Sequence, residues 1–512
     1  MGLQKTKTIK QKKNKMKTSI LKAVLWGTLA LPALTACEMD QFPTDSIPNE
    51  ESWQVYQDAV NFNQGLYRYL QSVSSVGWYM SDIQMDYFQP GKGYGNRMGM
   101  TYRWEFLATE DDMESVWSTA YSAITNANNF INNYRSIITP ETSEDEATAL
   151  EQFAGEAYFI RAYAYYVLAT RFCKDYNAAT AQTDLGLPIM ETVDINARPA
   201  RSTMQETWDF IKGDLDKADS LITETDPTGT HISLPVVDAM RARVALQMDN
   251  YSDAVNYAKQ LVENDYFALA SDSASFANLW INDEGDEIIF EPAEDNQVRH
   301  TWGGFFQYNV SQSAFSPDWI PSQTTYDMYE DGDLRKSQWF MQADKVIESD
   351  VESTAGIMLF AKYPGNPALL KAGESTLTTR ANAPKMIRVA EMYLILAEAY
   401  AQQGDNENAR KYLNDLLSSR GASEVEASGN ILAAVKQEWK KEFIGEGMRM
   451  TCLKRWGEGF RRNPAAQDES LIVMTTPELG VAANIAASNM RWVWEIPQND
   501  LTTNKNLVPN WQ

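Results

Sequence analysis

The chain has 512 residues, with 69 Asp or Glu, 45 Lys or Arg, three Cys and only two His. A chain of this length exceeds one compact core, so two subdomains or a repeat scaffold is expected. An apolar content of 44%, with 11% aromatics, excludes wholesale disorder. The formal charge of −24 argues against nucleic acid as a partner, because its phosphates would be repelled. Two histidines argue against a histidine-rich metal site.

The N-terminus has the pattern of an export signal. Residues 1–22 carry eight lysines and no acidic residue, and an apolar run extends from Ala23 to Leu34. A basic region before a short apolar run predicts a secretory signal over 1–36, with Met1 or Met16 as the initiator. The run is too short to span a bilayer comfortably.

The segment Leu34-Thr35-Ala36-Cys37 resembles the lipobox of bacterial lipoproteins, in which the cysteine is lipidated and becomes the first residue of the mature chain. The resemblance predicts a lipid anchor on Cys37. The alternative is an ordinary cleaved signal with an incidental cysteine.

Cleavage before Cys37 would remove all eight lysines and take the formal charge from −24 to −32. Such a surface is not attracted to anionic lipid, so acyl chains would supply the membrane attachment. Residues 37–49 are polar and contain Pro43 and Pro48, which predicts a lipidated tether. The remaining cysteines, Cys173 and Cys452, are interpreted as buried apolar residues, with a bond between them left open.

Helical periodicity begins near Glu50 and recurs along the chain. Apolar residues at three- and four-residue steps predict helices over Trp117–Ile131, Glu151–Phe172 and Met204–Leu221, the last capped by Ser202 or Thr203.

Two later segments share a spacing of small residues. Ala242 and Ala254 flank a turn at Asp249-Asn250, while Ala397 and Ala409 flank a turn at Gly404-Asp405. Small residues at these offsets let two antiparallel helices approach closely, as in tetratricopeptide repeats. We expect a single domain over 50–512, with tetratricopeptide-like helix pairs within about 110–270 and 385–460.

Two windows, 76–106 and 276–340, are rich in aromatic residues and lack helical periodicity, which predicts loops. Loops on a rigid frame often carry binding groups, and Trp and Tyr offer broad faces to a ligand. The alternative for any single ring is local core beneath a long loop. Glycines in the first window favour exposure of Trp78 and Tyr79. The candidate ligand-binding residues are Trp78, Tyr79, Tyr102, Trp104, Trp302, Trp319 and Tyr326.

Catalytic and metal-binding motifs are missing from the sequence. It contains no nucleophile elbow, zinc-protease motif, P-loop or dinucleotide-binding fingerprint. His231 and His300 lack CxxC partners and are interpreted as structural or exposed. The acidic clusters at 110–112 and 283–287 are interpreted as solvated loops, with calcium at the second as a minor alternative. No catalytic residue, cofactor or metal is therefore predicted.

Seven motifs that follow the lipobox, in order, carry a resemblance to the SusD/RagB-like outer-membrane lipoproteins over essentially the whole mature chain. They are Trp117-x-x-x-Tyr121-x-x-Ile124, Glu156-x-x-x-x-Arg161 with Gly186-x-Pro188, Arg198-Pro199-x-Arg201-Ser202, Ile387-Arg388-x-Ala390-Glu391, Glu442-Phe443-x-Gly445-Glu446-Gly447, Lys454-Arg455-Trp456-Gly457, and Trp494-x-Ile496-Pro497. Two departures are Thr451-Cys452, where the family commonly has an aromatic residue and Asp, and Asp500 for the usual Glu.

The resemblance implies a mainly α fold, a helical scaffold of tetratricopeptide-like pairs with a loop-rich ligand face. It implies a non-catalytic lipoprotein, anchored in the outer membrane and facing the cell exterior, that captures nutrient oligomers for a SusC-like TonB-dependent transporter. Most members bind glycans and some bind peptides. On this basis Arg161, Arg388 and Glu391 belong to the scaffold, and ligand residues do not transfer from motif to motif.

Four hypotheses follow, in order of preference. Glycan capture comes first and peptide capture by the same architecture second, with basic peptides favoured by the negative charge. A glycosidase, whose paired carboxylates no sequence pattern supplies or excludes, and a pure assembly scaffold come last.

Overall fold

The computed structural model describes residues 52–225, 229–297, 299–462, 465–474 and 476–511. Residues Trp53–Gln512 form one compact unit. The predicted signal, Cys37 and the tether at 37–49 lie outside the described residues. Within the described residues, none of the helices combines the length and the apolar character that crossing a bilayer requires.

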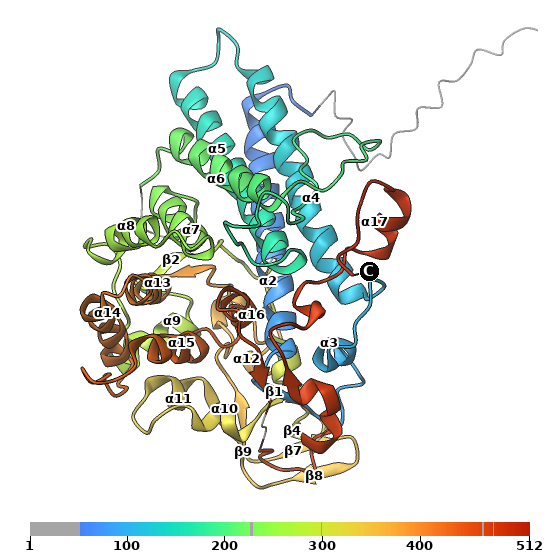
Figure 1. Ribbon diagram of the computed structural model, residues 1–512, viewed down its shortest axis with the longest axis vertical. Helices are drawn as coiled ribbons and strands as arrows, with labels where there is room; N and C mark the ends of the chain where they lie inside the picture. Colours follow the sequence, from blue (N-terminus) through green and yellow to red (C-terminus); the bar gives the residue numbers. More distant parts are fainter. Residues whose placement is uncertain (1–51, 226–228, 298, 463–464, 475, 512) are drawn as a thin grey trace, which may run out of the picture. The chain divides into compact units, whose positions relative to one another are not determined.

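Helices dominate the described chain, and strands are short (Figure 1). The helices are α2 (Tyr56–Gln84), α3 (Gly99–Arg103), α4 (Asp111–Asn133), α5 (Glu144–Phe172), α6 (Met204–Leu221), α7 (Leu234–Gln247), α8 (Tyr251–Val262), α9 (Ser273–Ile281), α10 (Gln323–Asp327), α11 (Leu334–Gln338), α12 (Thr376–Thr379), α13 (Val389–Gln402), α14 (Asn406–Ser419), α15 (Ile431–Glu442), α16 (Arg449–Arg455) and α17 (Gln498–Thr503). The strands are β1 (Phe88–Pro90), β2 (Ile288–Phe290), β3 (Tyr308–Asn309), β4 (Ala314–Phe315), β5 (Trp319–Pro321), β6 (Phe340–Ala343), β7 (Val346–Glu348), β8 (Val351–Ser353), β9 (Ile357–Phe360), β10 (Ile387–Arg388), β11 (Phe460–Arg461) and β12 (Asn484–Ile485). The predicted mainly α fold is confirmed.

Helices α2, α4, α5 and α6 pack side by side (Figure 1). At the start of α6, the Thr203 hydroxyl accepts from the Glu206 backbone N–H at 3.1 Å while the Glu206 carboxylate accepts from the Thr203 N–H at 2.8 Å. This reciprocal capping box selects Thr203, rather than Ser202, as the N-cap. A buried ion pair joins α5 to α6, with 2.6 Å between Arg161 Nη2 and Asp214 Oδ1, so Arg161 has the structural role predicted for it.

The two predicted tetratricopeptide-like pairs are α7–α8 and α13–α14, and α13 also packs against α7 and α8. Ala242, Ala254, Ala397 and Ala409 are fully buried in these contacts. Arg243 of α7 donates two bonds of 2.6 Å to Glu391 of α13. Helix pairs distant in the sequence therefore form one packed layer, because small side chains let the helices approach and a buried ion pair links them.

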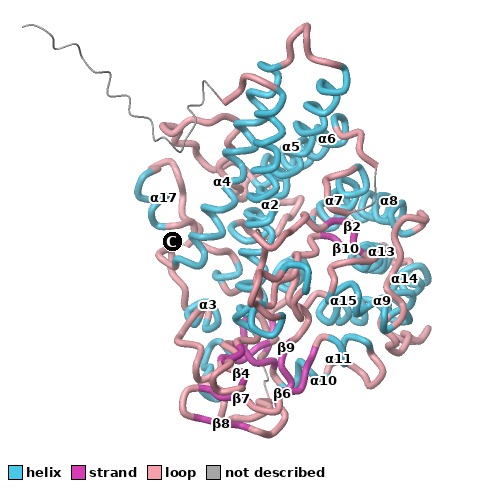
Figure 2. Tube along the Cα trace, turned by 180° about the vertical axis from the view of Figure 1, so that it is seen from behind, coloured by secondary structure: helices cyan, strands magenta, loops and turns pink. Residues whose placement is uncertain are grey.

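The first aromatic window differs from its prediction. Its beginning is helical, because α2 continues to Gln84, and α3 lies near its end. The second window contains short strands, of which Figure 2 shows β4 and β6 below α3 and near α10, while β2 lies apart and pairs with β10. Antiparallel pairing of β1 with β5, in which Pro90 lies opposite Trp319, joins the two windows directly.

A buried ionic network connects the helix pair α13–α14 to the surrounding loops. Its members are Arg335, Arg388, Arg420, Lys362, Asp333, Glu287, Glu438, Glu442 and Glu446. Glu442 lies at its centre and is fully buried. Burial alone would raise the pKa of Glu442, but Arg420, Arg388 and Arg335 together lower that pKa well below its ordinary value.

Buried ion pairs correct the interpretation of residues 283–287 as a solvated loop at Asp283 and Glu287, whereas Glu284 and Asp286 are exposed as expected. Glu287 is buried and accepts from Arg388 Nη1 at 2.6 Å, and Asp283 accepts from Lys385 Nζ at 2.7 Å. Residues 110–112 also differ, since Glu110 is the N-cap of α4 and Asp111 and Asp112 form its first turn. Cys173 and Cys452 are both buried free thiols, so the structure contains no bond between them.

We predict that Glu442→Gln lowers the free energy of unfolding by about 3–5 kcal/mol, because it leaves three buried guanidinium groups without their shared anion. Denaturant unfolding of a soluble form of residues 38–512 measures the change. Glu141→Gln, an exposed carboxylate before α5, is the control and should stay within about 0.5 kcal/mol of the parent. Equal stability of the two variants would contradict the central role of Glu442.

Candidate binding site

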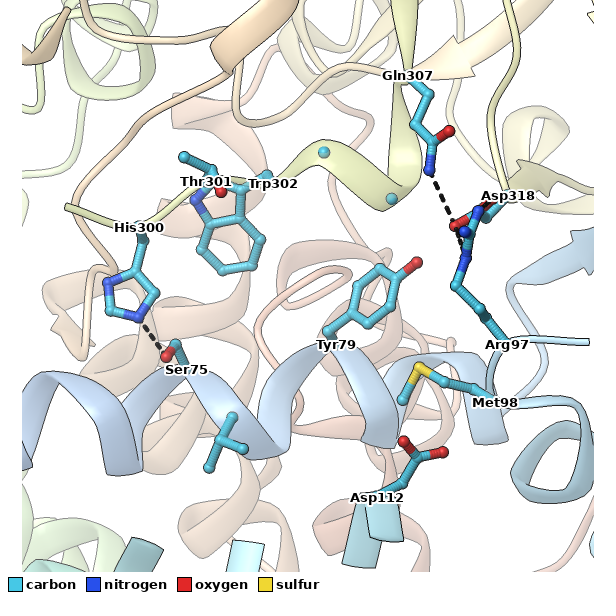
Figure 3. Close-up of a pocket in the computed structure, with 13 residues that line it drawn as sticks. Ser75, Tyr79, Arg97, Met98, Asp112, His300, Thr301, Trp302, Gln307 and Asp318 are labelled. Atoms are coloured by element: carbon cyan, nitrogen blue, oxygen red, sulfur yellow. Dashed lines mark hydrogen bonds and ion pairs between the residues drawn. The ribbon is translucent and has the colours of Figure 1, made fainter. Parts of the chain in front are cut away.

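A pocket of about 700 Å³ lies where α2 faces the segment 300–307 (Figure 3). Its lining comes from α2, the loop before α3, the first turn of α4 and the second aromatic window. The lining residues are Ser75, Val76, Tyr79, Arg97, Met98, Asp112, His300, Thr301, Trp302, Gly303, Gly304, Gln307 and Asp318.

Trp302 is fixed on one wall of the pocket. One face of its indole stacks on Tyr363, with ring centroids 3.7 Å apart and planes at 5°. Its Nε1 donates to the Asn382 carbonyl at 3.2 Å. The ring is 6% exposed, so its orientation is set by these contacts and it offers a ligand little of its surface.

Tyr79 is the half-buried aromatic residue in the pocket, and Figure 3 shows its ring rising from α2 toward the 300–307 segment. Phe305 contacts the ring edge-on, with centroids 4.5 Å apart. A Cβ added at Gly304 would lie 2.2 Å from the Tyr79 hydroxyl oxygen, whereas one added at Gly303 would meet no atom within 4 Å. The glycine at 304 therefore makes room for the phenol.

Polar side chains occupy the side of the pocket beyond Tyr79. Arg97 forms a bidentate pair with Asp318, in which the Nε–Oδ2 distance is 2.7 Å, and Gln307 Nε2 donates to the same carboxylate at 3.1 Å. The Arg97 side chain is 56% exposed and that of Asp318 only 6%. The carboxylate thus fixes a guanidinium whose remaining N–H groups face solvent, an arrangement suited to binding hydroxyl groups.

His300 closes the opposite side. Its Nδ1 lies 2.6 Å from the Glu294 carboxylate and its Nε2 contacts the Ser75 hydroxyl of α2. His300 is therefore structural, as predicted, because it ties the second window to α2, but it also lines the pocket.

The motif Glu442–Gly447 holds α2 in place beneath the pocket. The backbone N–H groups of Gly445 and Gly447 donate to the buried Asp82 carboxylate of α2 at 2.6 and 3.3 Å. Burial raises the pKa of Asp82 to about 7 despite these two bonds. The Tyr363 hydroxyl donates to the Gly445 carbonyl at 2.9 Å, so the same turn positions the ring beneath Trp302.

Of the predicted ligand-binding residues, the structure places Tyr79 and Trp302 in the pocket. Trp78 lies directly behind, with its ring centroid 6.4 Å from that of Trp302. It is only 7% exposed, so the expectation that it is exposed is wrong. The Gly447 backbone covers it, because a Cβ there would lie 2.7 Å from the Trp78 Cα.

The other four candidates lie outside the pocket. Tyr102 and Trp319 are fully buried and contact each other, with centroids 5.2 Å apart, because the β1–β5 pairing brings the two windows together. Trp104 is buried against Trp492. Tyr326 is half-buried against Phe340. A ligand-binding role for all seven residues stays a prediction.

The sequence analysis did not single out Arg97, Asp318, Gln307 or Asp112 as binding residues. Arg97 and its carboxylate partner Asp318 lie far apart in the chain and follow no motif. The one local signal is the pair Gly303-Gly304 directly after Trp302. In the residues with described side chains, no cluster of three or more His, Cys, Asp or Glu residues is arranged to hold a metal ion.

Comparisons with known proteins agree on one family. A model of the SusD family matches residues 87–512. The SusD-like protein P38 of Formosa agariphila is 25% identical over 478 residues, which cover 86% of this chain and 90% of that protein. A solved SusD superfamily protein from Bacteroides thetaiotaomicron superposes with a TM-score of 0.72 at 24% identity, covering 90% of this chain and all of the other. A SusD-like carbohydrate binding protein from Bacteroides vulgatus superposes with a TM-score of 0.71 at 21% identity, over 89% and 97% of the two chains.

We predict that Gly304→Ala displaces the Tyr79 ring from the pocket, because the added methyl group would overlap the phenol oxygen. Gly303→Ala, one residue earlier and in the same short 3-10 helix, should leave the ring where it is. Crystal structures of the two variants check the prediction. An undisturbed Tyr79 in Gly304→Ala would contradict it.

Proposed function

Since the chain belongs to the SusD family, we propose that it is a non-catalytic surface lipoprotein that captures glycan oligomers in the pocket around Tyr79. We further propose that Cys37 carries the lipid anchor, that the protein faces the cell exterior from the outer membrane, and that it delivers its ligand to a SusC-like TonB-dependent transporter. Peptide capture by the same architecture is the second candidate, favoured by the formal charge of −24.

The observation that carries glycan capture is the combination of an apolar ring with planar polar groups in one pocket. Tyr79 offers an aromatic surface to the C–H groups of a sugar ring, and Arg97 and Gln307 offer donors to its hydroxyls. A fold relative is named as a carbohydrate binding protein, which supports the same ligand class. Each such contact is weak, on the order of 1 kcal/mol, so capture depends on several acting together.

The carboxylates of the pocket support binding over hydrolysis. A glycosidase of the common type needs two carboxyl groups that flank the bond to be cleaved. Arg97 and Gln307 bind the Asp318 carboxylate, so Asp112 is the pocket carboxylate that has no side-chain partner among the described residues. The pair of available carboxyl groups that such hydrolysis needs is therefore incomplete in this lining.

Calorimetry of the soluble form, residues 38–512, against a panel of polysaccharides, their oligosaccharides and mixed peptides tests glycan capture. We expect saturable glycan binding with no new reducing ends. Tyr79→Ala and Arg97→Ala should each weaken it by about three- to tenfold, since each removes one contact of the set.

Tyr266→Ala is the matched control, because Tyr266 is 61% exposed and lies outside the pocket, so its affinity should equal that of the parent. Saturable peptide binding would instead support the second candidate. Release of shortened sugars would overturn the non-catalytic assignment.

We predict that Cys37→Ala abolishes both acyl labelling and membrane recovery of the protein expressed in a bacterium with an outer membrane. Metabolic labelling with a palmitate analogue, followed by fractionation, measures both. Cys173→Ala changes a buried thiol elsewhere in the chain and should keep the label. A labelled Cys37→Ala protein would refute the anchor assignment.

A further inference from the structure

The charges lining the pocket are unbalanced toward acid. Arg97 is neutralised by its bidentate pair with Asp318, and His300 lies against Glu294. The Asp112 carboxylate has no hydrogen bond or ion pair to another described side chain, and Figure 3 shows its oxygens directed toward Met98 on the pocket side. The Arg97 guanidinium of the lining therefore has an acid of its own, and the Asp112 carboxylate has no cationic partner among the described side chains.

Further acidic residues lie next to the residues that line the pocket. Glu348 is fully buried beside Asp318 and accepts from the Gly93 N–H at 2.5 Å. Burial raises the pKa of Glu348 to about 7, and the charge of Asp318 contributes to this rise. Glu110 and Asp111 precede Asp112 in the chain, and burial followed by the charge of Asp111 raises the Asp112 pKa.

Two arginines that lie close in the chain to lining residues are already paired with acids. The Arg103 side chain pairs with Glu105 at 2.8 Å, and Arg299 pairs with Glu374 at 2.7 Å. A carboxylate or sulfate entering the pocket would lose its hydration and meet like charges, whereas an ammonium group would gain a partner. Such a site discriminates by repulsion as well as by attraction.

Resting on the proposed capture of sugars in this pocket, we propose that it admits neutral and amine-bearing sugars and rejects uronate- and sulfate-bearing ones, with Asp112 as the residue that sets this selectivity. Asp112 is the second residue of α4, where the positive end of the helix dipole opposes the rise in its pKa. Asp318 cannot take the same role, because Arg97 and Gln307 engage its oxygens.

The test compares three monosaccharides of the same ring configuration by saturation-transfer NMR with the soluble form of residues 38–512 at neutral pH and low salt. Glucose is neutral, glucosamine carries an ammonium group and glucuronate carries a carboxylate. We expect glucosamine to bind about two- to fivefold more tightly than glucose, and glucuronate most weakly. High salt should reduce the difference.

Asp112→Asn should bring glucosamine to parity with glucose and strengthen glucuronate binding. Asp145→Asn is the matched control, because Asp145 is an exposed aspartate at the second position of α5 and lies outside the pocket. This control should keep the order of the parent protein.

Equal binding of the three sugars, or an order that Asp112→Asn leaves unchanged, would overturn the selectivity while sugar capture stands. Absence of a binding signal from all three sugars would count against both the selectivity and the proposed sugar capture. If N-acetyl-lysine methylamide binds as tightly as glucosamine, the site recognises the amine alone. That result would assign the pocket to basic peptides and overturn the proposal.

Discussion

Glu442 receives three guanidinium groups in the interior, and the position of the loops around the pocket depends on that contact. Arg388 comes from β10, Arg420 from the end of α14 and Arg335 from α11, so one carboxylate fixes three segments that are distant in the sequence. Burying these charges is costly, and their geometry must compensate by satisfying most of the donors. The same cost makes other arrangements of the segments unfavourable, since each would leave a buried charge unpaired.

Two sets of contacts connect this network to the pocket. Glu446, which accepts from Arg388 and Lys362, lies in the turn whose glycine N–H groups bind Asp82 of α2. The same turn accepts a hydrogen bond from Tyr363, which stacks on Trp302. A motif that identifies the family thus acts as scaffold, holding α2 and the 300–307 segment at the separation that the pocket requires.

The pocket itself combines a positioned ring with polar groups fixed by ion pairs. Tyr79 stands where Gly304 leaves space, and Asp318 orients Arg97 so that the guanidinium remains half exposed. Such preorganised side chains lose little conformational entropy when a ligand binds. The acidic surroundings add selection by charge, which is consistent with a chain whose formal charge is −24.

The sequence by itself determined the features that depend on neighbours along the chain. The turns at Asp249 and Gly404 and the alanines that let helices pair are set within one or two helical turns, so periodicity and turn rules identify them. For the α6 cap the same local rules left Ser202 or Thr203, and the structure selects Thr203. The exposure of each aromatic ring was decided only by the tertiary structure. Trp319 and Tyr102 are buried because β5 pairs with β1. Tyr79 lines the pocket because α2 continues to Gln84, into the glycine-containing window for which the sequence predicted a loop. The pocket likewise unites residues from Ser75 to Asp318, and no local pattern specifies which distant partner covers a ring or pairs with a charge.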